Sequence, residues 1–396
     1  MDKKDIFVRG FKASSISAGL KKNKAADMLL IYSEREAVSA GVFTTNRVKA
    51  APVLLSMEHI LKGKARAIIA NAGNANACTG SEGLKNAGLT AEVTAGELGI
   101  KSEEVLIAST GVIGAQLDME KVVAAIPGLV KGLSEDNIYL AAEAIMTTDS
   151  FLKISLFEGK AGKSPYRILG IAKGAGMIMP NMATMLCFIM TDINIENAPL
   201  KKALSWSVEK SFNRITVDGD TSTNDTVFIL ANGMAGNDSL NADDYESFTK
   251  GLQEVMNDLA TMIAKDGEGA TKLVFIDLKG AASEKDAMTA ARNIANSYLV
   301  KTAFYGQDAN WGRIMAAIGR SGISMEEKEI SIWIDDVKIV EGGMGTGPGQ
   351  EKIAAERMKN RSFSVKIDLN MGDHEYNVTT CDLTHEYVSI NANYRT

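Results

Sequence analysis

The stretch 173–192, KGAGMIMPNMATMLCFIMTD, constrains this chain more than any other part of the sequence. Its first half is predicted to be a loop, because its two glycines allow backbone conformations closed to other residues. Its proline also biases the preceding residue towards an extended form. Its second half contains an unbroken apolar run, 185–190, which is typical of a short strand buried on both faces. Thr184 is therefore expected where a flexible loop enters a buried strand.

The position of Thr184 invites a chemical role. A threonine hydroxyl is a weak nucleophile and needs a base beside it. Cleavage of the peptide bond between Ala183 and Thr184 would supply that base, because the freed α-amino group has a pKa of about 7.7–8.0. The hydroxyl can make the cut itself by attacking the carbonyl group of Ala183. The alternative is that Thr184 is an ordinary β-branched residue at the start of a strand.

The run 173–186 resembles the self-cleavage motif of the ornithine acetyltransferase family, the glutamate N-acetyltransferases of arginine biosynthesis. The resemblance covers nearly the whole chain. It implies self-cleavage between Ala183 and Thr184 into an alpha fragment, residues 1–183, and a beta fragment, residues 184–396, whose N-terminal threonine carries acetyl. It also implies an α/β fold: a layered sandwich of sheets and helices, similar to that of N-terminal-nucleophile aminopeptidases.

A second segment, 105–114, has the pattern of a buried strand that ends in a glycine-bearing turn. A hydroxyl and a backbone N–H group at a strand end are suited to stabilise an oxygen that becomes negative during acyl transfer. A plain turn explains these residues equally well. The family resemblance assigns the oxyanion hole to Thr110 and Gly111.

The resemblance also implies substrate contacts at Thr147, Glu268, Asn391 and Thr396. We expect Lys173 and Thr184 to contact the substrate as well. Judged by charge, Lys173 suits the α-carboxylate of an amino acid, and Glu268 suits a substrate amine or a positioning role. Asn391 and Thr396 belong to a C-terminal tail that the family inserts into its active site.

The run 218–225, DGDTSTND, contains three aspartates but does not fit a calcium loop. Thr223 stands where an EF-hand needs glycine, and Ile229 stands where it needs glutamate. We interpret the run as part of the active-site wall, because the family has a similar run. The chain has three histidines and neither an H-E-x-x-H nor a G-x-S-x-G motif, so no metal site or serine elbow is expected.

Composition limits the remaining function classes. The net charge of −6 gives no reason to expect nucleic acid or an anionic membrane as a partner. No apolar run approaches the ~18–20 residues of a membrane span, and no apolar segment of a signal peptide follows the first residues. The three cysteines cannot all pair. We therefore expect a cytoplasmic protein without a bound cofactor.

Hydrophobic patterns predict an alternation of strands and helices along the chain. Helices are expected at 82–98, 118–132, 135–146, 197–212, 242–264 and 283–299. Strands are expected at 28–32, 41–45, 53–56, 151–157, 185–190, 227–231, 273–279, 363–370 and 384–390.

The resulting hypothesis is ping-pong transfer of acetyl from N2-acetylornithine to glutamate through an acetyl group on Thr184. The expected partners are these small molecules and, from the resemblance, a heterotetramer of two alpha and two beta fragments. Acetyl-CoA stays open as a second donor, because one-substrate and two-substrate enzymes of the family share their catalytic motifs. Two other classes stay open as well. One is an amidohydrolase or aminopeptidase of the same fold, and the other is a non-catalytic binding protein.

Overall fold

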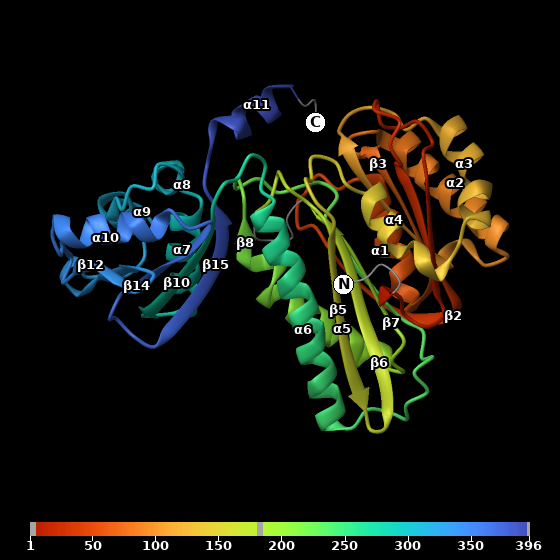
Figure 1. Cartoon of the computed structure of the whole chain (residues 1–396). Helices are drawn as coiled ribbons and strands as arrows, with labels where there is room; N and C mark the ends of the chain where they lie inside the picture. The colour runs from red at the N-terminus through yellow and green to blue at the C-terminus, as the bar shows by residue number, and fades with distance from the viewer. Residues whose placement is uncertain (1–4, 180–184, 394–396) are drawn as a thin grey trace. The chain divides into compact units, whose positions relative to one another are not determined.

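The computed structural model describes residues 5–179 and 185–393, and the chain divides into two compact units (Figure 1). Within the described residues, unit 1 comprises the chain up to residue 213 together with 220–263, and unit 2 comprises 214–219 and 264–393. The fragments predicted from the sequence, 1–183 and 184–396, are a different division. They follow a cut in the covalent chain rather than its packing, and they stay a prediction.

Unit 1 is built on one sheet, which has eight strands among the described residues. The strands are β1 (Phe11–Ile16), β2 (Met28–Phe43), β3 (Lys64–Asn74), β4 (Val105–Val112), β5 (Lys153–Ala161), β6 (Ser164–Lys173), β7 (Leu186–Thr191) and β9 (Thr226–Ala231). The helices are α1 (Ala51–His59), α2 (Gly80–Leu98), α3 (Met119–Lys131), α4 (Ile138–Ala144), α5 (Asn197–Lys210) and α6 (Ala242–Lys265). The strand order is β4-β3-β2-β9-β7-β6-β5, with β1 paired to β2.

This sheet bends back on itself at β2. Strands β4 and β6 are five places apart in the order, which in a flat sheet means about 24 Å at the usual strand spacing. Yet Lys173 Nζ, on the last residue of β6, lies 3.1 Å from Thr110 Oγ1 on β4. The pairing of β2 with β3 is irregular between Tyr32 and Ala37, and such an irregularity lets a strand bend. Buried apolar side chains of β3 and β4 share one core with those of β7 and β9.

Helices cover the outer faces of the bent sheet (Figure 1). On one half, Ala87, Ala91 and Ala95 form a buried stripe along α2 that packs against β3 and β4, together with α3. On the other half, Gly170 of β6 leaves room for Leu259 of α6. Unit 1 is therefore layered as helix, sheet, sheet and helix, which confirms the predicted α/β sandwich.

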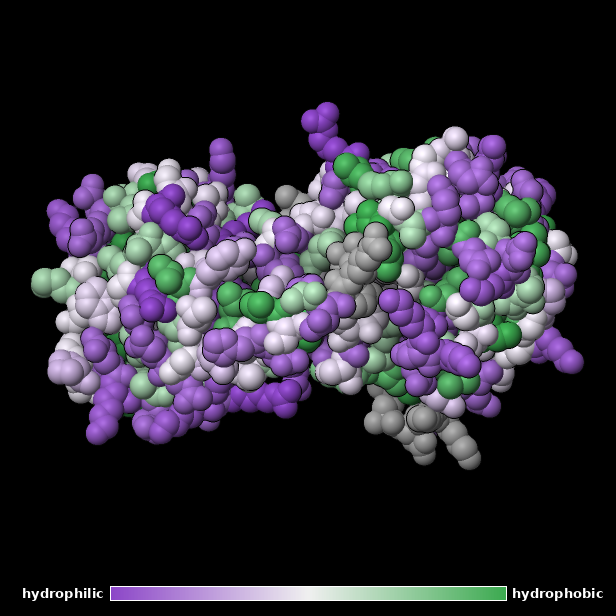
Figure 2. All heavy atoms as spheres, turned by 90° about the horizontal axis from the view of Figure 1, so that it is seen from above, coloured by the Kyte–Doolittle hydropathy of each residue, from purple (hydrophilic) through white to green (hydrophobic). Residues whose placement is uncertain are grey.

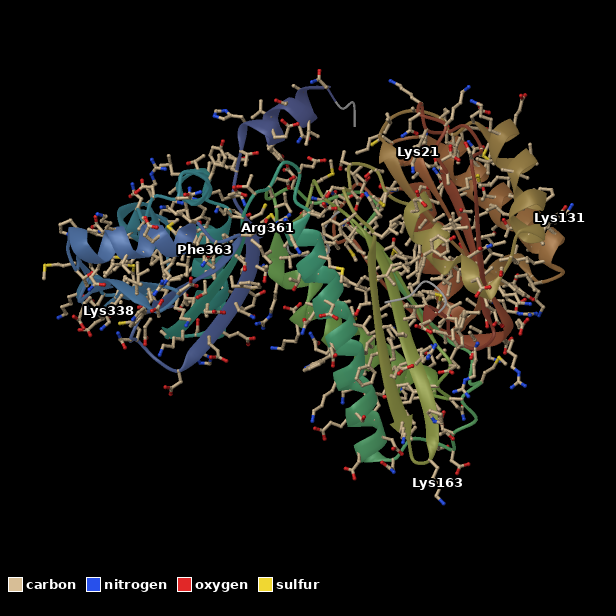
Figure 3. All side chains as sticks on the ribbon, in the orientation of Figure 1. Lys21, Lys131, Lys163, Lys338, Arg361 and Phe363 are labelled. Atoms are coloured by element: carbon tan, nitrogen blue, oxygen red, sulfur yellow. The ribbon has the colours of Figure 1, made fainter. Side chains whose placement is uncertain are left out.

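Unit 2 is built on a second sheet, with seven strands among the described residues. Its strands, in the order that they take across the sheet, are β13 (Met344–Gly345), β12 (Val337–Glu341), β11 (Ser331–Ile334), β14 (Ser362–Asp368), β10 (Leu273–Ala281), β15 (His374–Cys381) and β8 (Ile215–Thr216). Its helices are α7 (Glu284–Ala295), α8 (Tyr298–Tyr305), α9 (Trp311–Gly319), α10 (Pro348–Met358) and α11 (His385–Asn393). Helices α7 to α10 share one core with the sheet. In this core Phe363 of β14, labelled in Figure 3, meets Phe304 edge-on with ring centroids 5.5 Å apart.

Two strands predicted from apolar runs are wrong. The run 53–56 lies inside α1, which begins with proline in its first turn, where a missing N–H group costs nothing. The run 384–390 lies mostly in α11. There the hydroxyl of Thr384 accepts a hydrogen bond from the amide of Tyr387 (3.4 Å), the arrangement of a helix N-cap. A proline in the first turn of α1 and the Thr384 hydroxyl before α11 therefore favour a helix over a strand in these runs.

In the part of the chain that the structure describes, no helix is both long and apolar enough to cross a membrane. On the face drawn in Figure 2, hydrophilic and hydrophobic residues are mixed over the described surface. The exposed large apolar residues include Leu61 after α1 and Tyr298, Leu299 and Tyr305 on α8.

Candidate active site

Three predicted site residues lie outside the described residues: Ala183, Thr184 and Thr396. The strands on either side of the first two are described. Lys173, the last residue of β6, pairs in antiparallel register with Leu186, the first residue of β7. All six residues of β7 are buried, so the strand predicted after the loop is confirmed. Segment 174–185 therefore connects neighbouring strands at one end of the sheet.

Thr110 and Gly111 lie near the end of β4, beside the end of the parallel strand β3. Gly111 pairs with Gly73 and has a φ of +132°, which side chains rarely permit. A Cβ atom at Gly111 would lie 2.3 Å from the carbonyl carbon of Gly73, so only glycine allows this close approach. Thr110 is 5% exposed. A hydroxyl and backbone N–H groups in such a water-poor site are suited to stabilise a developing negative oxygen.

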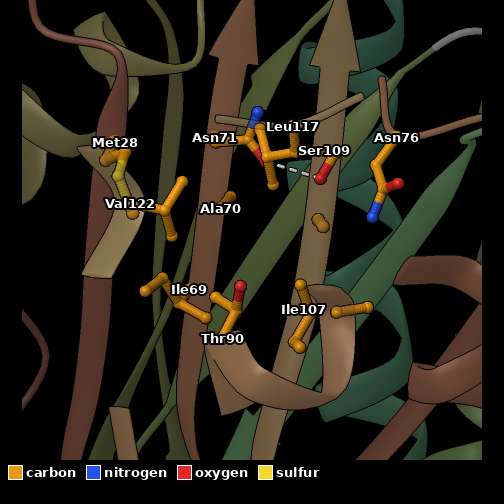
Figure 4. A pocket seen from close by; sticks show the side chains of 12 residues that line it. Met28, Ile69, Ala70, Asn71, Asn76, Thr90, Ile107, Ser109, Leu117 and Val122 are labelled. Atoms are coloured by element: carbon orange, nitrogen blue, oxygen red, sulfur yellow. Dashed lines mark hydrogen bonds between the residues drawn. The ribbon is translucent and has the colours of Figure 1, made fainter. Parts of the chain in front are cut away.

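Side-chain amides hold the strand ends behind Thr110. Ser109 Oγ donates to Asn71 Oδ1 at 2.6 Å, the bond drawn in Figure 4. Asn224 Nδ2 donates to the carbonyl oxygens of Ser109 (2.8 Å) and Ala75 (2.7 Å). The end of the run 218–225 is therefore hydrogen-bonded to the strand ends next to Thr110.

The cavity in Figure 4 lies between these strands and helices α2 and α3. Its volume is about 10 Å³, and apolar side chains form most of its lining, with Asn71 and Ser109 among the polar ones. This is room for about one water molecule, so the cavity is too small for a substrate.

Lys173 contacts the predicted oxyanion residue directly. Its Nζ donates to Thr110 Oγ1 at 3.1 Å, and the residue is 3% exposed. A lysine ammonium has donors only, so the threonine oxygen is the acceptor. The structure thus brings together two residues that the sequence assigned to different tasks, substrate binding for Lys173 and oxyanion stabilisation for Thr110.

Asp149 accepts hydrogen bonds from the segments of unit 1 that contain Thr147 and Lys173. Its Oδ1 accepts hydrogen bonds from Lys153 Nζ (2.6 Å) and from the amide of Gly174 (2.7 Å). Its Oδ2 accepts from the amide of Thr147 (2.9 Å). Burial raises the pKa of Asp149, but the charges of Lys173 and Lys153 and these hydrogen bonds outweigh burial and hold the pKa at about 2. The carboxylate is therefore ionised at neutral pH.

Asp225 is hydrogen-bonded to the residue that directly precedes β7. Its Oδ1 accepts a hydrogen bond from the amide of Met185 at 3.1 Å. Met185 follows Thr184 in the chain, so this bond is made to the peptide group that joins the two. The second oxygen, Oδ2, is buried without a hydrogen-bond partner among the described residues. Burial raises the pKa of Asp225 well above its ordinary value, against the hydrogen bond from Met185 and the charge of Lys173.

Two predicted substrate contacts lie in unit 2. Asn391 Nδ2, on α11, donates to Glu268 Oε2 at 2.7 Å. Glu268 is 8% exposed and lies in the turn after α6. On the same helix the hydroxyl of Tyr387 donates to Asp218 Oδ2 at 3.2 Å. Unit 2 therefore brings Glu268 and Asn391 together as a pair.

Comparison with known families identifies the chain. The sequence profile of the ArgJ family matches residues 12–396. The chain belongs to the ArgJ family. The arginine biosynthesis bifunctional protein ArgJ of Geobacter sulfurreducens is 49% identical over 98% of this chain and 100% of its own length. The protein of the same name from Syntrophotalea carbinolica is 50% identical over 99% of this chain and 100% of its own.

A solved structure of the ArgJ family agrees with this membership. The crystal structure of arginine biosynthesis bifunctional protein ArgJ from Bacillus halodurans is similar with a TM-score of 0.50 and 44% identity. The match covers 52% of this chain and 98% of that chain, so that chain is about half as long. The resemblance to the ornithine acetyltransferase family that the motif predicted is confirmed.

Residues Asp149, Asp225 and Asn224 were not singled out from the sequence as individual site residues of this ArgJ family member. The sequence signal for Asp149 is weak, since Lys153 and Thr147 are close in the chain but Gly174 lies 25 residues on, directly after β6. Asp225 ends a run already interpreted as active-site wall, yet its contact with Met185 depends on the pairing of β7 with β9.

Proposed function

We propose that this ArgJ family member transfers the acetyl group of N2-acetylornithine to glutamate through an acetyl group carried on Thr184. Family membership favours this activity over the hydrolase and the binding protein that the sequence left open. The observation that carries the proposal is the arrangement at one end of the unit 1 sheet. There the loop that contains Thr184 begins at Lys173, whose ammonium group donates to the hydroxyl of Thr110.

Self-cleavage between Ala183 and Thr184 is the step that creates the nucleophile. The hydroxyl of Thr184 attacks the carbonyl carbon of Ala183, the peptide nitrogen leaves as the new α-amine, and water hydrolyses the resulting ester. The half-length chain of the Bacillus halodurans structure supports a cut near the middle of the chain. The ends of the loop are held by the pairing of Lys173 with Leu186 and by the bond from Met185 to Asp225.

Acetyl transfer then follows in two half-reactions. Thr184 Oγ attacks the acetyl carbon while the α-amine of Thr184 takes the hydroxyl proton. The hydroxyl of Thr110 and the N–H group of Gly111 stabilise the negative oxygen. The bond to the ornithine nitrogen breaks, and that nitrogen receives the proton from the α-amine. The amine of glutamate attacks the acetyl ester by the reverse sequence, which regenerates the Thr184 hydroxyl.

The substrate-binding residues complete the proposal. They are Thr147, Lys173, Glu268, Asn391 and Thr396, with the oxyanion pair Thr110 and Gly111. The names of the curated relatives include the word bifunctional, which supports a second activity with acetyl-CoA as donor. We also propose a heterotetramer of two alpha and two beta fragments and a cytoplasmic location. The free thiols of Cys78, Cys187 and Cys381 fit a reducing compartment.

Intact mass spectrometry tests the cut. Purified wild-type protein should give two fragments, residues 1–183 and 184–396, and the second should begin Thr-Met-Leu-Cys. Thr184→Ala should leave one uncut chain without transferase activity, because it removes the hydroxyl. Thr184→Ser keeps a hydroxyl and should retain part of both activities. A wild-type chain that stays whole while it transfers acetyl would refute the assignment.

An acyl-enzyme experiment separates transfer from hydrolysis. Cut enzyme incubated with N2-acetylornithine alone should gain one acetyl mass on the fragment 184–396, mapped to Thr184. Glutamate should then discharge this adduct much faster than buffer does and release N-acetylglutamate. An adduct that decays at one rate with and without glutamate would make the protein a hydrolase. Labelled acetyl-CoA in place of N2-acetylornithine tests the second donor in the same way.

A further inference from the structure

The contact between Lys173 and Thr110 has a defined direction. Both residues are buried, at 3% and 5% exposure, and Nζ lies 3.1 Å from Oγ1. Because an ammonium group can only donate, Thr110 Oγ1 accepts, and the hydroxyl proton points away from Lys173. The described residues offer no acceptor for that proton. It is therefore available to an oxygen atom that enters the site.

The charge of Lys173 also strengthens the hydroxyl as a donor. A hydroxyl that accepts from a cation is polarised, and its own O–H group then donates a stronger hydrogen bond. Burial increases the effect, because the effective dielectric constant is lower than in water. Lys173 can thus act on a developing negative oxygen through Thr110.

Asp149 keeps Lys173 in this place. Its carboxylate binds the amide of Gly174, the residue that follows Lys173, at 2.7 Å, and it binds Lys153 at 2.6 Å. The side chains of Asp149 and Lys153 are both 0% exposed. The carboxylate therefore lies beside two ammonium groups, and one of them, that of Lys173, also contacts Thr110.

We propose that Lys173, held by Asp149, is a positioning residue of the oxyanion hole that sets the direction and donor strength of the Thr110 hydroxyl. This inference rests on the proposed acetyl transfer. It adds to the substrate contact proposed above for Lys173. The two roles have different kinetic effects, because stabilisation of the oxyanion acts in the transition state and raises kcat, whereas a contact with the substrate carboxylate alone acts on KM.

A double-mutant cycle tests the inference. The variants are Lys173→Met, Thr110→Val, which keeps the shape but removes the hydroxyl, and the combination of both. Lys173→Met alone should lower kcat roughly 10- to 100-fold, less than the 10²–10³ typical for loss of an oxyanion donor. Any rise in the KM values for N2-acetylornithine and glutamate reports the separate substrate contact, so the loss of kcat measures the oxyanion role. In the Thr110→Val background, Lys173→Met should cost less than about threefold, because the group it acts through is gone.

Three results would overturn the inference. One is an equal loss of kcat from Lys173→Met with and without the Thr110 hydroxyl. Another is a raised KM for both substrates at unchanged kcat, which is the signature of carboxylate binding. The third is a Lys173→Met chain that stays wholly uncut, because this result places Lys173 in the cleavage reaction. If cut wild-type enzyme transfers no acetyl at all, the proposed function fails first.

Asp149→Asn tests the support for Lys173, with Lys153→Met as its matched control. Both variants disturb the same buried ion pair, but only the first removes the carboxylate that holds the Lys173 segment. Asp149→Asn should lower kcat at least about tenfold, whereas Lys153→Met should stay within about threefold of wild type. Thermal midpoints measure the structural damage in each. Equal losses of kcat at equal losses of stability would reduce Asp149 to a structural residue. Should Asp149→Asn fail to fold, the Lys173 and Thr110 cycle still decides.

Discussion

Two buried aspartates in unit 1 have pKa values that are shifted in opposite directions. Asp149 accepts three hydrogen bonds, one of them from Lys153, and its pKa is held at about 2. Asp225 is equally buried and accepts from the amide of Met185. Burial raises its pKa well above the ordinary value. The charge of Lys173 favours the ionised form of both groups.

The difference shows that hydrogen bonds and neighbouring charges can outweigh the effect of burial on the pKa of a carboxyl group. Desolvation disfavours the ionised form of both aspartates, but Asp149 has enough donors and cations to outweigh it. Near Thr110, the end of the sheet therefore has an ionic cluster around Asp149, Lys153 and Lys173. The amide of Met185 instead donates to Asp225, a carboxyl group whose pKa is raised by burial.

The largest expected effect is on stability. Asp149→Ala leaves the ammonium groups of Lys153 and Lys173 buried without their carboxylate, which should cost about 3–5 kcal/mol of unfolding free energy. Asp225→Ala loses one hydrogen bond to a neutral amide and should cost about 1–3 kcal/mol. Urea denaturation of both variants in a Thr184→Ala background, where every chain is uncut, measures the two losses. Equal losses of unfolding free energy in the two variants would contradict the difference between the two aspartates.

The next effect is the pH dependence of the unfolding free energy, which should differ between the two aspartates. The folded pKa of Asp149, about 2, lies below the unfolded value of about 3.9. Its charge therefore stabilises the fold above pH ~4, and this contribution, about 2–3 kcal/mol, is lost as the pH falls to ~2. Lys21, labelled in Figure 3, also interacts electrostatically with Asp149. The difference in unfolding free energy between the parent protein and Asp149→Asn should therefore become smaller as the pH falls from ~4 to ~2. A difference that stays constant would contradict the low pKa of Asp149.

Much of the region that contains these aspartates could be predicted from the sequence. The apolar run at 185–190 is β7, and the glycine-ended strand at 105–114 is β4, because both patterns are local. The short apolar runs 28–32 and 41–45 were predicted as separate strands, whereas the first and most of the second lie in one long strand, β2. The runs 53–56 and 384–390 were misassigned because short apolar runs do not distinguish strand from helix.

The partners of the site residues could not be predicted in the same way. Lys173 meets Thr110 only because the sheet bends back at β2, and local periodicity does not encode that bend. Asp149 reaches Gly174 because β5 and β6 form a hairpin whose register pairs Lys153 with Ala172. The family resemblance supplied the identities of the site residues, and the fold supplies the contacts between them.

The smallest effect, and the sharpest test of the comparison, is expected at Asp225. Its folded pKa is raised above the unfolded value of about 3.9, so the folded state binds the proton more tightly. Stability from this group is fully present below pH ~4 and is lost as the pH rises towards the folded pKa. The groups that face the carboxyl group are the Met185 amide, the Lys173 ammonium, and the hydroxyls of Thr44 and Ser222.

Asp225→Asn in the uncut Thr184→Ala chain should therefore lie within about 1 kcal/mol of its parent near pH 4, because a neutral amide replaces a neutral acid. Above pH 5 it should become progressively more stable relative to its parent, the opposite slope to that of Asp149→Asn. Parallel slopes for the two aspartates, measured by urea denaturation from pH 4 to 9, would show that both carry the same charge.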